Sequence, residues 1–210
     1  MESSLQPVWM WVAVPVIPRE RWRRVAHRCL ALITANRCWT GQRNTPGVQY
    51  LYGSGNALPV GDNAIDVVTF AGVLSYLDRG KAIEELRRVC RKDALVLPYD
   101  FEVDLSGLED QLSLPTLSKA EDKSSYDHRC NFSGLSDIST LRRDSRLVEL
   151  NVTEVQAAHI LLSDKSRYEP LAIRFASNDP FFDVVETIRR IGWSGRLEAT
   201  IHYTLHRLET

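Results

Sequence analysis

The sequence lacks an apolar stretch long enough to cross a membrane. Val8–Ile17 is apolar, but it is shorter than the roughly 20 residues that a membrane-spanning helix needs. No basic residue precedes it, whereas a secretory signal peptide begins with positive charge. We therefore expect a soluble, cytoplasmic protein without a membrane partner.

Cysteine is scarce, and neither sign of charge is in excess. No two of the four cysteines have the C-x-x-C spacing of a zinc or redox site, so we expect free thiols in a reducing compartment and no metal site. With 26 basic and 27 acidic residues the net charge is −1, which gives no reason to expect a nucleic-acid partner. The cysteines are Cys29, Cys38, Cys90 and Cys130.

Lysine is missing from the first 46 residues, which hold seven arginines, two acids and four of the five tryptophans. Their net charge is +5, which leaves −6 for the rest of the chain. We therefore divide the sequence into an atypical N-terminal segment, 1–46, and a main domain, 47–210. Within the main domain, about 104–146 has little hydrophobic periodicity and is predicted to be a loop-rich insertion.

Hydrophobic patterning predicts the elements of the first half. Helical spacing of apolar residues predicts a helix over Arg19–Ile33. Strands are predicted over Gly47–Tyr52 and over Ile65–Ala71, whose nearly continuous apolar run is typical of a strand buried on both faces. A helix capped by Asp78 and a strand over Ala94–Pro98 follow, which makes a βαβ unit.

The second half is predicted to be helical between two strands. Short helices are expected near Leu108–Leu112 and Leu135–Arg142, within the insertion. Strands are expected over Leu147–Val155 and over Gly195–Leu208, whose apolar residues alternate from Leu197 to Leu205. The helices expected between these strands are Glu154–Leu162, Arg167–Phe175 and Pro180–Ile191.

Two motifs in the first half resemble a known family. The segment Ser54-Gly55-Asn56-Ala57-Leu58-Pro59 is followed by Asp62, and the strand over residues 65–71 runs into Gly72. This pattern resembles the type 11 branch of the class I methyltransferases that use S-adenosylmethionine. The resemblance implies an α/β fold, a Rossmann-like three-layer sandwich with a mostly parallel sheet and an antiparallel C-terminal strand, N-terminally incomplete in this chain.

The resemblance also implies a function and a cofactor site. The expected activity is methyl transfer from S-adenosylmethionine to a small-molecule acceptor. The side-chain amide of Asn56 would face the adenine edge, and the backbone N–H of Ala57 would serve the adenine ring nitrogen. The residues implied to bind the cofactor are Gly55, Asn56, Ala57, Leu58, Phe70, Ala71 and Gly72.

Two parts of the family's cofactor site are missing from the sequence. No strand in residues 1–46 is followed by G-x-G, and no acid ends a second strand. The alternative is therefore a catalytically inactive or truncated methyltransferase-like protein that acts as a binding module. A dinucleotide fingerprint at Tyr50–Gly55 is excluded, because Pro59 and Gly61 prevent the helix that such a fingerprint requires.

The sequence identifies no catalytic residue, but it offers candidate general bases near the predicted strand ends. These candidates are Tyr76, Tyr99, Asp100, Asp127 and His128. Four charged residues on the predicted helix after Asp78 are expected to form a solvated face, namely Glu84, Glu85, Arg87 and Arg88. Three histidines without metal-ligand spacing are expected to be structural or surface groups, namely His159, His202 and His206.

Overall fold

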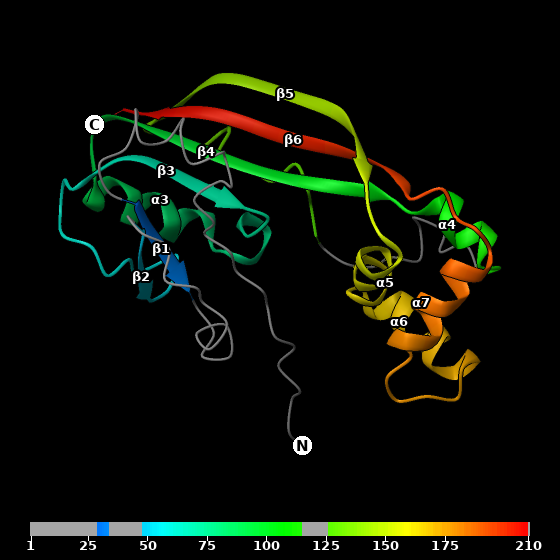
Figure 1. The fold of residues 1–210 in the computed structure, drawn as a ribbon. Helices are drawn as coiled ribbons and strands as arrows, with labels where there is room; N and C mark the ends of the chain where they lie inside the picture. Colours follow the sequence, from blue (N-terminus) through cyan, green and yellow to red (C-terminus); the bar gives the residue numbers. More distant parts are fainter. Residues whose placement is uncertain (1–28, 34–47, 115–125, 210) are drawn as a thin grey trace. The chain divides into compact units, whose positions relative to one another are not determined.

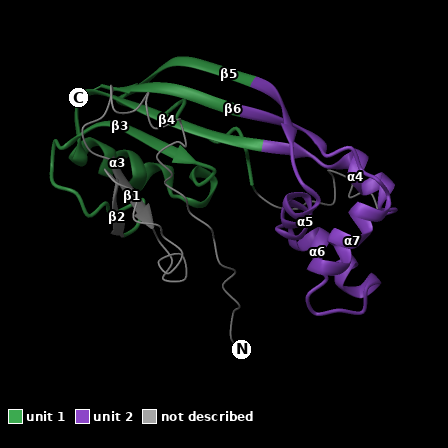
Figure 2. Ribbon diagram, in the orientation of Figure 1, with its two compact units in different colours: residues 1–101, 126–145, 202–210 green, residues 102–125, 146–201 purple. Residues whose placement is uncertain are grey.

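The structure is a computed structural model that describes residues 29–33, 48–114 and 126–209 (Figure 1). The chain divides into two compact units (Figure 2). Unit 1 comprises residues 1–101, 126–145 and 202–210, and unit 2 comprises residues 102–125 and 146–201. The boundaries differ from the predicted division at residue 46, which itself lies outside the described residues.

A pair of parallel strands, β1 (Cys29–Ile33) and β2 (Val48–Tyr52), comes first in the described chain. The strand predicted over Gly47–Tyr52 is confirmed. The helix predicted over Arg19–Ile33 is wrong in its last five residues, and the rest of it lies outside the described residues. An uninterrupted apolar run fits a strand as well as a helix, and the ladder from Cys29–Val48 to Ile33–Tyr52 decides between them.

The predicted βαβ unit is confirmed. Strand β3 (Ile65–Ala71) leads through the short helix η1 (Leu74–Tyr76) to α3 (Arg79–Val89). The side chain of Asp78 caps α3 by accepting a hydrogen bond from the Lys81 N–H at 3.2 Å. Strand β4 (Cys90–Asp104) is longer than predicted and lies parallel to β3.

The core of unit 1 lies between α3 and one face of these strands. Val68 and Phe70 of β3 belong to this core, and Thr69 between them is also buried. Val67 is 42% exposed, so the prediction of a strand buried on both faces holds only for the second half of β3. The ring of Phe132 lies edge-on to Phe70, with 5.3 Å between the centroids. The apolar residues of α3 in this core are Ala82, Ile83, Leu86 and Val89.

Two further strands complete the sheet, whose order is β3-β4-β6-β5. They are β5 (Ile138–Asn151) and β6 (Arg196–Leu208), and β6 runs in the direction opposite to β4, which confirms the antiparallel C-terminal strand (Figure 1). The helix predicted near Leu135–Arg142 is wrong, because most of this stretch is the start of β5. The apolar residues Leu135, Ile138 and Leu141 are three positions apart, which is the spacing of one face of a helix and led to the wrong prediction.

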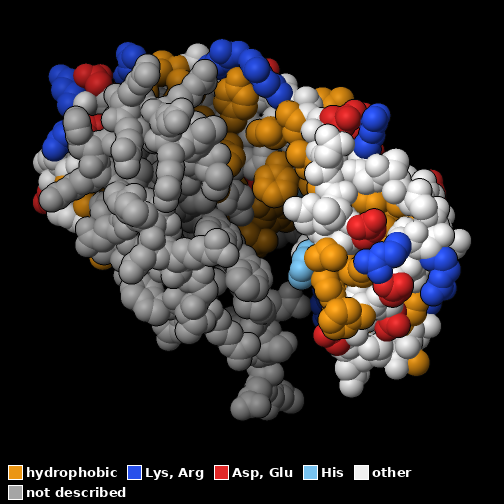
Figure 3. All heavy atoms as spheres, in the orientation of Figure 1, with side chains coloured by type: hydrophobic (Ala, Val, Ile, Leu, Met, Phe, Trp, Pro, Cys, Tyr) orange, Lys and Arg blue, Asp and Glu red, His pale blue; other side chains and the backbone are white. Residues whose placement is uncertain are grey.

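Unit 2 contains four helices in its described part: α4 (Ser106–Gln111), α5 (Glu154–Leu162), α6 (Lys165–Arg174) and α7 (Phe181–Arg190). All four predicted helices of this region are confirmed within about two residues. Acidic, basic and apolar side chains lie side by side on the visible face of unit 2 (Figure 3). None of the described helices has both the length and the apolar character needed to cross a bilayer.

The face that β6 buries changes along the strand. Leu197 and Ala199 are buried as predicted, but from Ile201 onward the buried side chains are the even-numbered ones. The prediction of one continuous apolar face is therefore wrong. The buried histidines of this face are hydrogen-bonded to β5, at 2.7 Å from His202 Nδ1 to Ser145 Oγ, and at 3.2 Å from His206 Nδ1 to Thr140 Oγ1.

Candidate functional site

The segment after β2 forms a tight turn rather than the start of a helix. The Ala57 N–H donates to the Ser54 carbonyl oxygen at 3.0 Å, which closes the turn. The exclusion of a dinucleotide fingerprint is therefore confirmed. Gly55 is buried, and a Cβ at this position would lie 2.8 Å from a methyl group of Leu77, so glycine lets that side chain pack closely.

The side chain of Asn56 presents a buried acceptor at this turn. Its Oδ1 atom is inaccessible to solvent and has no hydrogen-bond partner among the described residues. An unsatisfied buried acceptor costs about 1–3 kcal/mol, so this atom is suited to accept from a bound ligand. The Ala57 N–H, by contrast, is already engaged within the turn, and the structure therefore gives it no role toward a ring nitrogen.

Helix α3 fixes the loop that carries this turn. The Leu58 N–H donates to Glu85 Oε1 at 2.7 Å. The guanidinium of Arg88 donates to the carbonyl oxygens of Val60 at 2.8 Å and Leu58 at 3.0 Å, and to Asp62 Oδ1 at 2.7 Å. The hydrogen bond from Arg88 lowers the pKa of Glu85. The prediction that Glu85 and Arg88 belong to a solvated face is thus wrong, because both hold this loop in place.

Strand β3 ends beside Tyr99 of β4, which itself continues to Asp104. The N–H of Gly72, the residue after β3, donates to the Tyr99 carbonyl oxygen at 2.9 Å, and the φ of +62° at Gly72 favours glycine. A Cβ on Gly72 would also lie 3.1 Å from Asp100 Oδ1. Of the residues predicted to bind the cofactor here, Phe70 is buried in the core and Ala71 is partly exposed.

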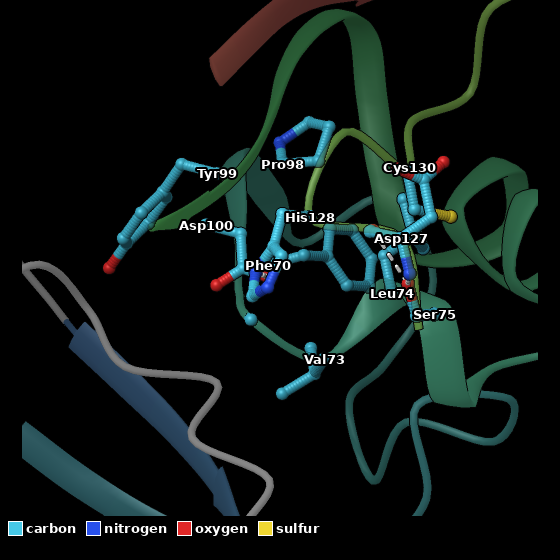
Figure 4. A pocket seen from close by; sticks show the side chains of 11 residues that line it. Phe70, Val73, Leu74, Ser75, Pro98, Tyr99, Asp100, Asp127, His128 and Cys130 are labelled. Atoms are coloured by element: carbon cyan, nitrogen blue, oxygen red, sulfur yellow. Dashed lines mark hydrogen bonds and ion pairs between the residues drawn. The ribbon is translucent and has the colours of Figure 1, made fainter. Parts of the chain in front are cut away.

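A small pocket opens where β3 ends beside β4 (Figure 4). Its cavity measures about 10 Å³, which is room for about one water molecule. Phe70 and Gly72 contribute from the end of β3, and Tyr99 and Asp100 contribute from β4. Ligands of open α/β sheets bind at such carboxyl ends of strands. The rest of the wall comes from residues 73–75 after β3, from Pro98 in β4, and from Asp127, His128 and Cys130.

Asp100 lies at the centre of the polar side chains in this pocket. Its Oδ2 atom is 2.5 Å from the hydroxyl of Tyr126 and 3.2 Å from Nδ1 of His128. Its Oδ1 atom accepts from the Phe101 N–H at 2.7 Å. The Tyr126 hydroxyl also lies 2.8 Å from the Gly72 carbonyl oxygen. These contacts position both the phenol and the imidazole around one carboxylate.

Three aromatic rings stand in a row beside Asp100. The centroids of Tyr76 and Tyr126 are 5.1 Å apart, and those of Tyr126 and His128 are 4.8 Å apart in an edge-to-face arrangement. Burial, followed by the nearby Asp100 carboxylate, raises the pKa of Tyr76 and strongly raises the pKa of Tyr126. Burial also raises the pKa of Tyr99. These phenols are therefore neutral donors near pH 7 and poor bases.

The loop that begins at Tyr126 is fastened to the segment after β3. The Ser75 hydroxyl donates to the Asp127 carbonyl oxygen at 2.8 Å, and the Asp127 N–H lies 3.2 Å from the same hydroxyl. Arg79 donates to the Asn131 carbonyl oxygen at 3.0 Å. These contacts join parts of the chain that are about 50 residues apart, and they place His128 beside Asp100.

All five predicted candidate bases are in or beside this one site. Tyr99, Asp100, Asp127 and His128 line the pocket, and Tyr76 stacks on Tyr126 next to it. Sequence reasoning missed Tyr126, because a tyrosine in a polar stretch without periodicity carries no signal of its own. Its position two residues before His128 was the one available hint.

Comparisons with known proteins agree with the predicted resemblance. Residues 25–97 match the family model described as methyltransferase domain. A structure described as a type II methyltransferase from Anaeromyxobacter dehalogenans has a TM-score of 0.58 at 16% identity, over 90% of this chain and 84% of that one. A structure described as a methyltransferase from Bacillus halodurans has a TM-score of 0.46 at 13% identity, over 86% and 83%. The sequence matches no curated protein.

These comparisons confirm the resemblance to the methyltransferase domain and the α/β fold that it implies. The match to the family model begins within the N-terminal segment that composition set apart, and it ends in β4. It therefore includes β1 and β2, the Asn56 turn and α3. The structural similarity at 16% identity supports the fold alone.

Proposed function

We propose that this protein transfers a methyl group from S-adenosylmethionine to a small-molecule acceptor. The match of residues 25–97 to the methyltransferase domain supports the reaction class. The observation that carries the cofactor assignment is the buried, unpartnered Oδ1 atom of Asn56. When bound, S-adenosylmethionine supplies an electrophilic methyl carbon.

The residues of the Asn56 turn fit the adenine end of this cofactor. Asn56 Oδ1 would accept a hydrogen bond from the exocyclic amino group of the adenine. This hydrogen bond would remove the free-energy cost of a buried acceptor without a partner. Gly55, Ala57 and Leu58 would line this end, held by the contacts of Leu58 with Glu85 and Arg88.

The end of β3 fits the side where methyl transfer would take place. Phe70, Ala71 and Gly72 would line the cofactor there, and Asp100 and His128 would face the acceptor. Much of the acceleration of such a displacement comes from holding the nucleophile about 3–3.5 Å from the methyl carbon and in line with it. The protein's task is therefore to orient the acceptor and to exclude competing water.

A second candidate function is that of a methyltransferase-like binding module without activity. The observation that favours it is the Ala57 N–H, which donates to Ser54 and so does not present a second contact to an adenine ring. The missing G-x-G after a strand in residues 1–46 points the same way. Binding without turnover would distinguish this candidate from the first.

Calorimetric titration with S-adenosylhomocysteine tests the proposal. We expect saturable binding, and we expect Asn56→Ala to weaken it about 2- to 10-fold, the effect of one neutral hydrogen bond. Asn178→Ala is the matched control, because Asn178 is exposed in unit 2. An absence of binding at millimolar ligand would overturn the proposal. Binding that is unchanged in Asn56→Ala would overturn the assignment of the adenine contact.

A further inference from the structure

We infer that the side-chain amide of Asn56 determines which purine the site binds, and that it accepts a 6-oxopurine nucleoside as readily as a 6-aminopurine nucleoside. The inference rests on the proposed function, because it concerns the base end of the proposed cofactor site. It adds a second class of ligand, in which hypoxanthine takes the place of adenine. It comes from the hydrogen bonds of the turn after β2, which lies in unit 1.

The two kinds of purine differ at two adjacent atoms. Adenine has an amino group at C6, which donates hydrogen bonds, and an unprotonated N1, which accepts them. Hypoxanthine has a carbonyl oxygen at C6, which accepts, and a protonated N1, which donates. A protein group of fixed polarity opposite either atom therefore favours one base and disfavours the other, since two donors or two acceptors that face each other leave both unsatisfied.

The backbone donors of the turn already have acceptors. The Ala57 N–H donates to the Ser54 carbonyl oxygen at 3.0 Å, and the Leu58 N–H donates to Glu85 Oε1 at 2.7 Å. The Asn56 N–H donates to Ser54 Oγ at 3.2 Å. These three N–H groups are therefore not available as fixed donors for an unprotonated N1, and they give adenine no advantage over hypoxanthine.

The carboxylates of the loop are bound to Arg88. Its Nε donates to Glu85 Oε2 at 2.9 Å, and its Nη1 donates to Asp62 Oδ1 at 2.7 Å. This pairing offsets the negative charge that would otherwise favour a donating amino group. The partly buried side chains of Leu58 and Leu77, which pack against the core of unit 1, are apolar and cannot distinguish an amino group from a carbonyl oxygen.

The amide of Asn56 is a group whose polarity can change. Its carbonyl oxygen accepts and its NH2 group donates, and a half-turn about χ2 exchanges their positions. Oδ1 has no partner among the described residues, and no hydrogen bond to one of them holds Nδ2. A half-turn therefore breaks no hydrogen bond within the described ranges, so the bound base determines which end faces it.

Each purine then finds a matching partner in the same side chain. With Oδ1 toward the base, Asn56 accepts from the 6-amino group of adenine. After a half-turn, Nδ2 donates to the 6-oxo group of hypoxanthine. Each complex gains one hydrogen bond between neutral groups, so the two affinities should agree within about threefold. An aspartate at this position would only accept, and it would favour the 6-amino group.

Calorimetric titration of the full chain with S-adenosylhomocysteine and S-inosylhomocysteine tests the inference. We expect the two Kd values to agree within about threefold in the unmodified protein. Asn56→Asp, which keeps the shape of the side chain and removes its donors, should bind the inosyl compound about 10- to 100-fold more weakly than the adenosyl compound. Asn178→Asp, at an exposed position in unit 2, is the matched control and should leave the ratio unchanged.

Nuclear magnetic resonance of the unmodified protein, labelled with ¹⁵N-asparagine, provides a second measurement that does not depend on a variant. The inosyl compound should shift one Nδ2 proton of Asn56 downfield, because that proton enters a hydrogen bond with the base. The adenosyl compound should not do so, because the carbonyl oxygen then faces the base. Identical Nδ2 signals with both compounds would overturn the inference.

The titrations separate this inference from the proposed function. If S-adenosylhomocysteine binds and the inosyl compound binds more than about tenfold more weakly to the unmodified protein, the inference fails alone. A ratio in Asn56→Asp equal to that of the unmodified protein would likewise contradict the role of Asn56. If neither compound binds at millimolar concentration, the proposed function fails, and the inference fails with it.

Discussion

His206 is a histidine buried completely among apolar and aromatic side chains. Its ring lies edge-on to Phe132, 6.1 Å between centroids, and its Nε2 atom has no hydrogen-bond partner among the described residues. Burial, followed by the charge of Arg143, lowers the pKa of His206 to about 4. The folded protein therefore keeps this ring neutral over a range of pH in which an unfolded chain would protonate it.

This depressed pKa predicts a loss of stability in mild acid. The unfolded histidine has a pKa of about 6.5, so the contribution is complete above that pH and is lost as the pH falls from about 6.5 to about 4. It amounts to at most about 3 kcal/mol. Urea unfolding at pH 7 and pH 5 measures the difference, which should shrink in His206→Gln and persist in His159→Gln. An equal pH dependence in both variants would contradict the prediction.

Gly72 combines a left-handed backbone with a close contact. Gly72→Ala should destabilise the fold by about 1–2 kcal/mol for its φ of +62°, and the new Cβ would also press on Asp100. Gly61→Ala is the matched control, because nothing lies within 4 Å of a Cβ there. Urea unfolding curves should separate the two variants. Similar midpoints would show that the backbone at Gly72 relaxes freely.

At the scale of single residues, the sequence indicated which residues belong to the site better than it indicated which contacts each of them makes. Asn56 and the five candidate bases were named from motif and position, and the structure brings the five bases together in or beside one pocket. Tyr126 and the engagement of the Ala57 N–H could not be read from the sequence, since both depend on contacts made by the fold. The role of Arg88 was missed for the same reason, because a charged helix residue gives no sign of which carbonyl oxygens it will reach.

At the scale of elements, α3 does more than cover the sheet, since Arg88 joins it to the loop that carries Asn56. Arg88→Met should release the carbonyl oxygens of Leu58 and Val60 and loosen that loop. We expect amide hydrogen exchange in peptides covering residues 55–63 to become about tenfold faster, as for a local opening made easier by about 1.4 kcal/mol. Lys92→Met, at an exposed position, is the control, and equal protection in both variants would contradict this role.

Elements were predicted well where local signals agreed with long-range pairing. The cap at Asp78 and the apolar run of β3 each specified one structure. The last turn of the predicted helix over Arg19–Ile33 and the helix near Leu135–Arg142 failed, because short apolar patterns fit helix and strand alike and the partner strand decides. The partner strands, β2 and β6, lie elsewhere in the sequence, so the local pattern of residues does not show which strand will pair.

At the scale of the whole molecule, a bound ligand should raise the stability of the fold. If S-adenosylhomocysteine binds only the folded chain, a concentration of 100 times Kd adds about 2.7 kcal/mol to the free energy of unfolding. Thermal unfolding should therefore shift upward by several degrees, and the shift should grow with ligand concentration. Adding the same concentration of homocysteine alone is the control. A Tm that does not respond to the ligand would contradict binding to the folded state.

The sequence did not reveal that the chain forms two units. Both units are built from separate stretches, and the strands β4, β5 and β6 each run across a boundary between them. Composition marks a change near residue 46, but it gives no signal at residues 101 or 145, where one strand continues without interruption. Because these unit boundaries fall inside strands, the sequence pattern of each strand continues across the boundary and does not reveal it.

The order of strands has a consequence for synthesis on the ribosome. Strand β6, which follows β4 and β5 in the sequence, lies between them in the sheet. Until residues 196–208 emerge, the inner edges of β4 and β5 have no partner, and unpaired edges invite association with other chains. The nascent protein should therefore depend on protection by chaperones until residues 196–208 have emerged and paired with both strands.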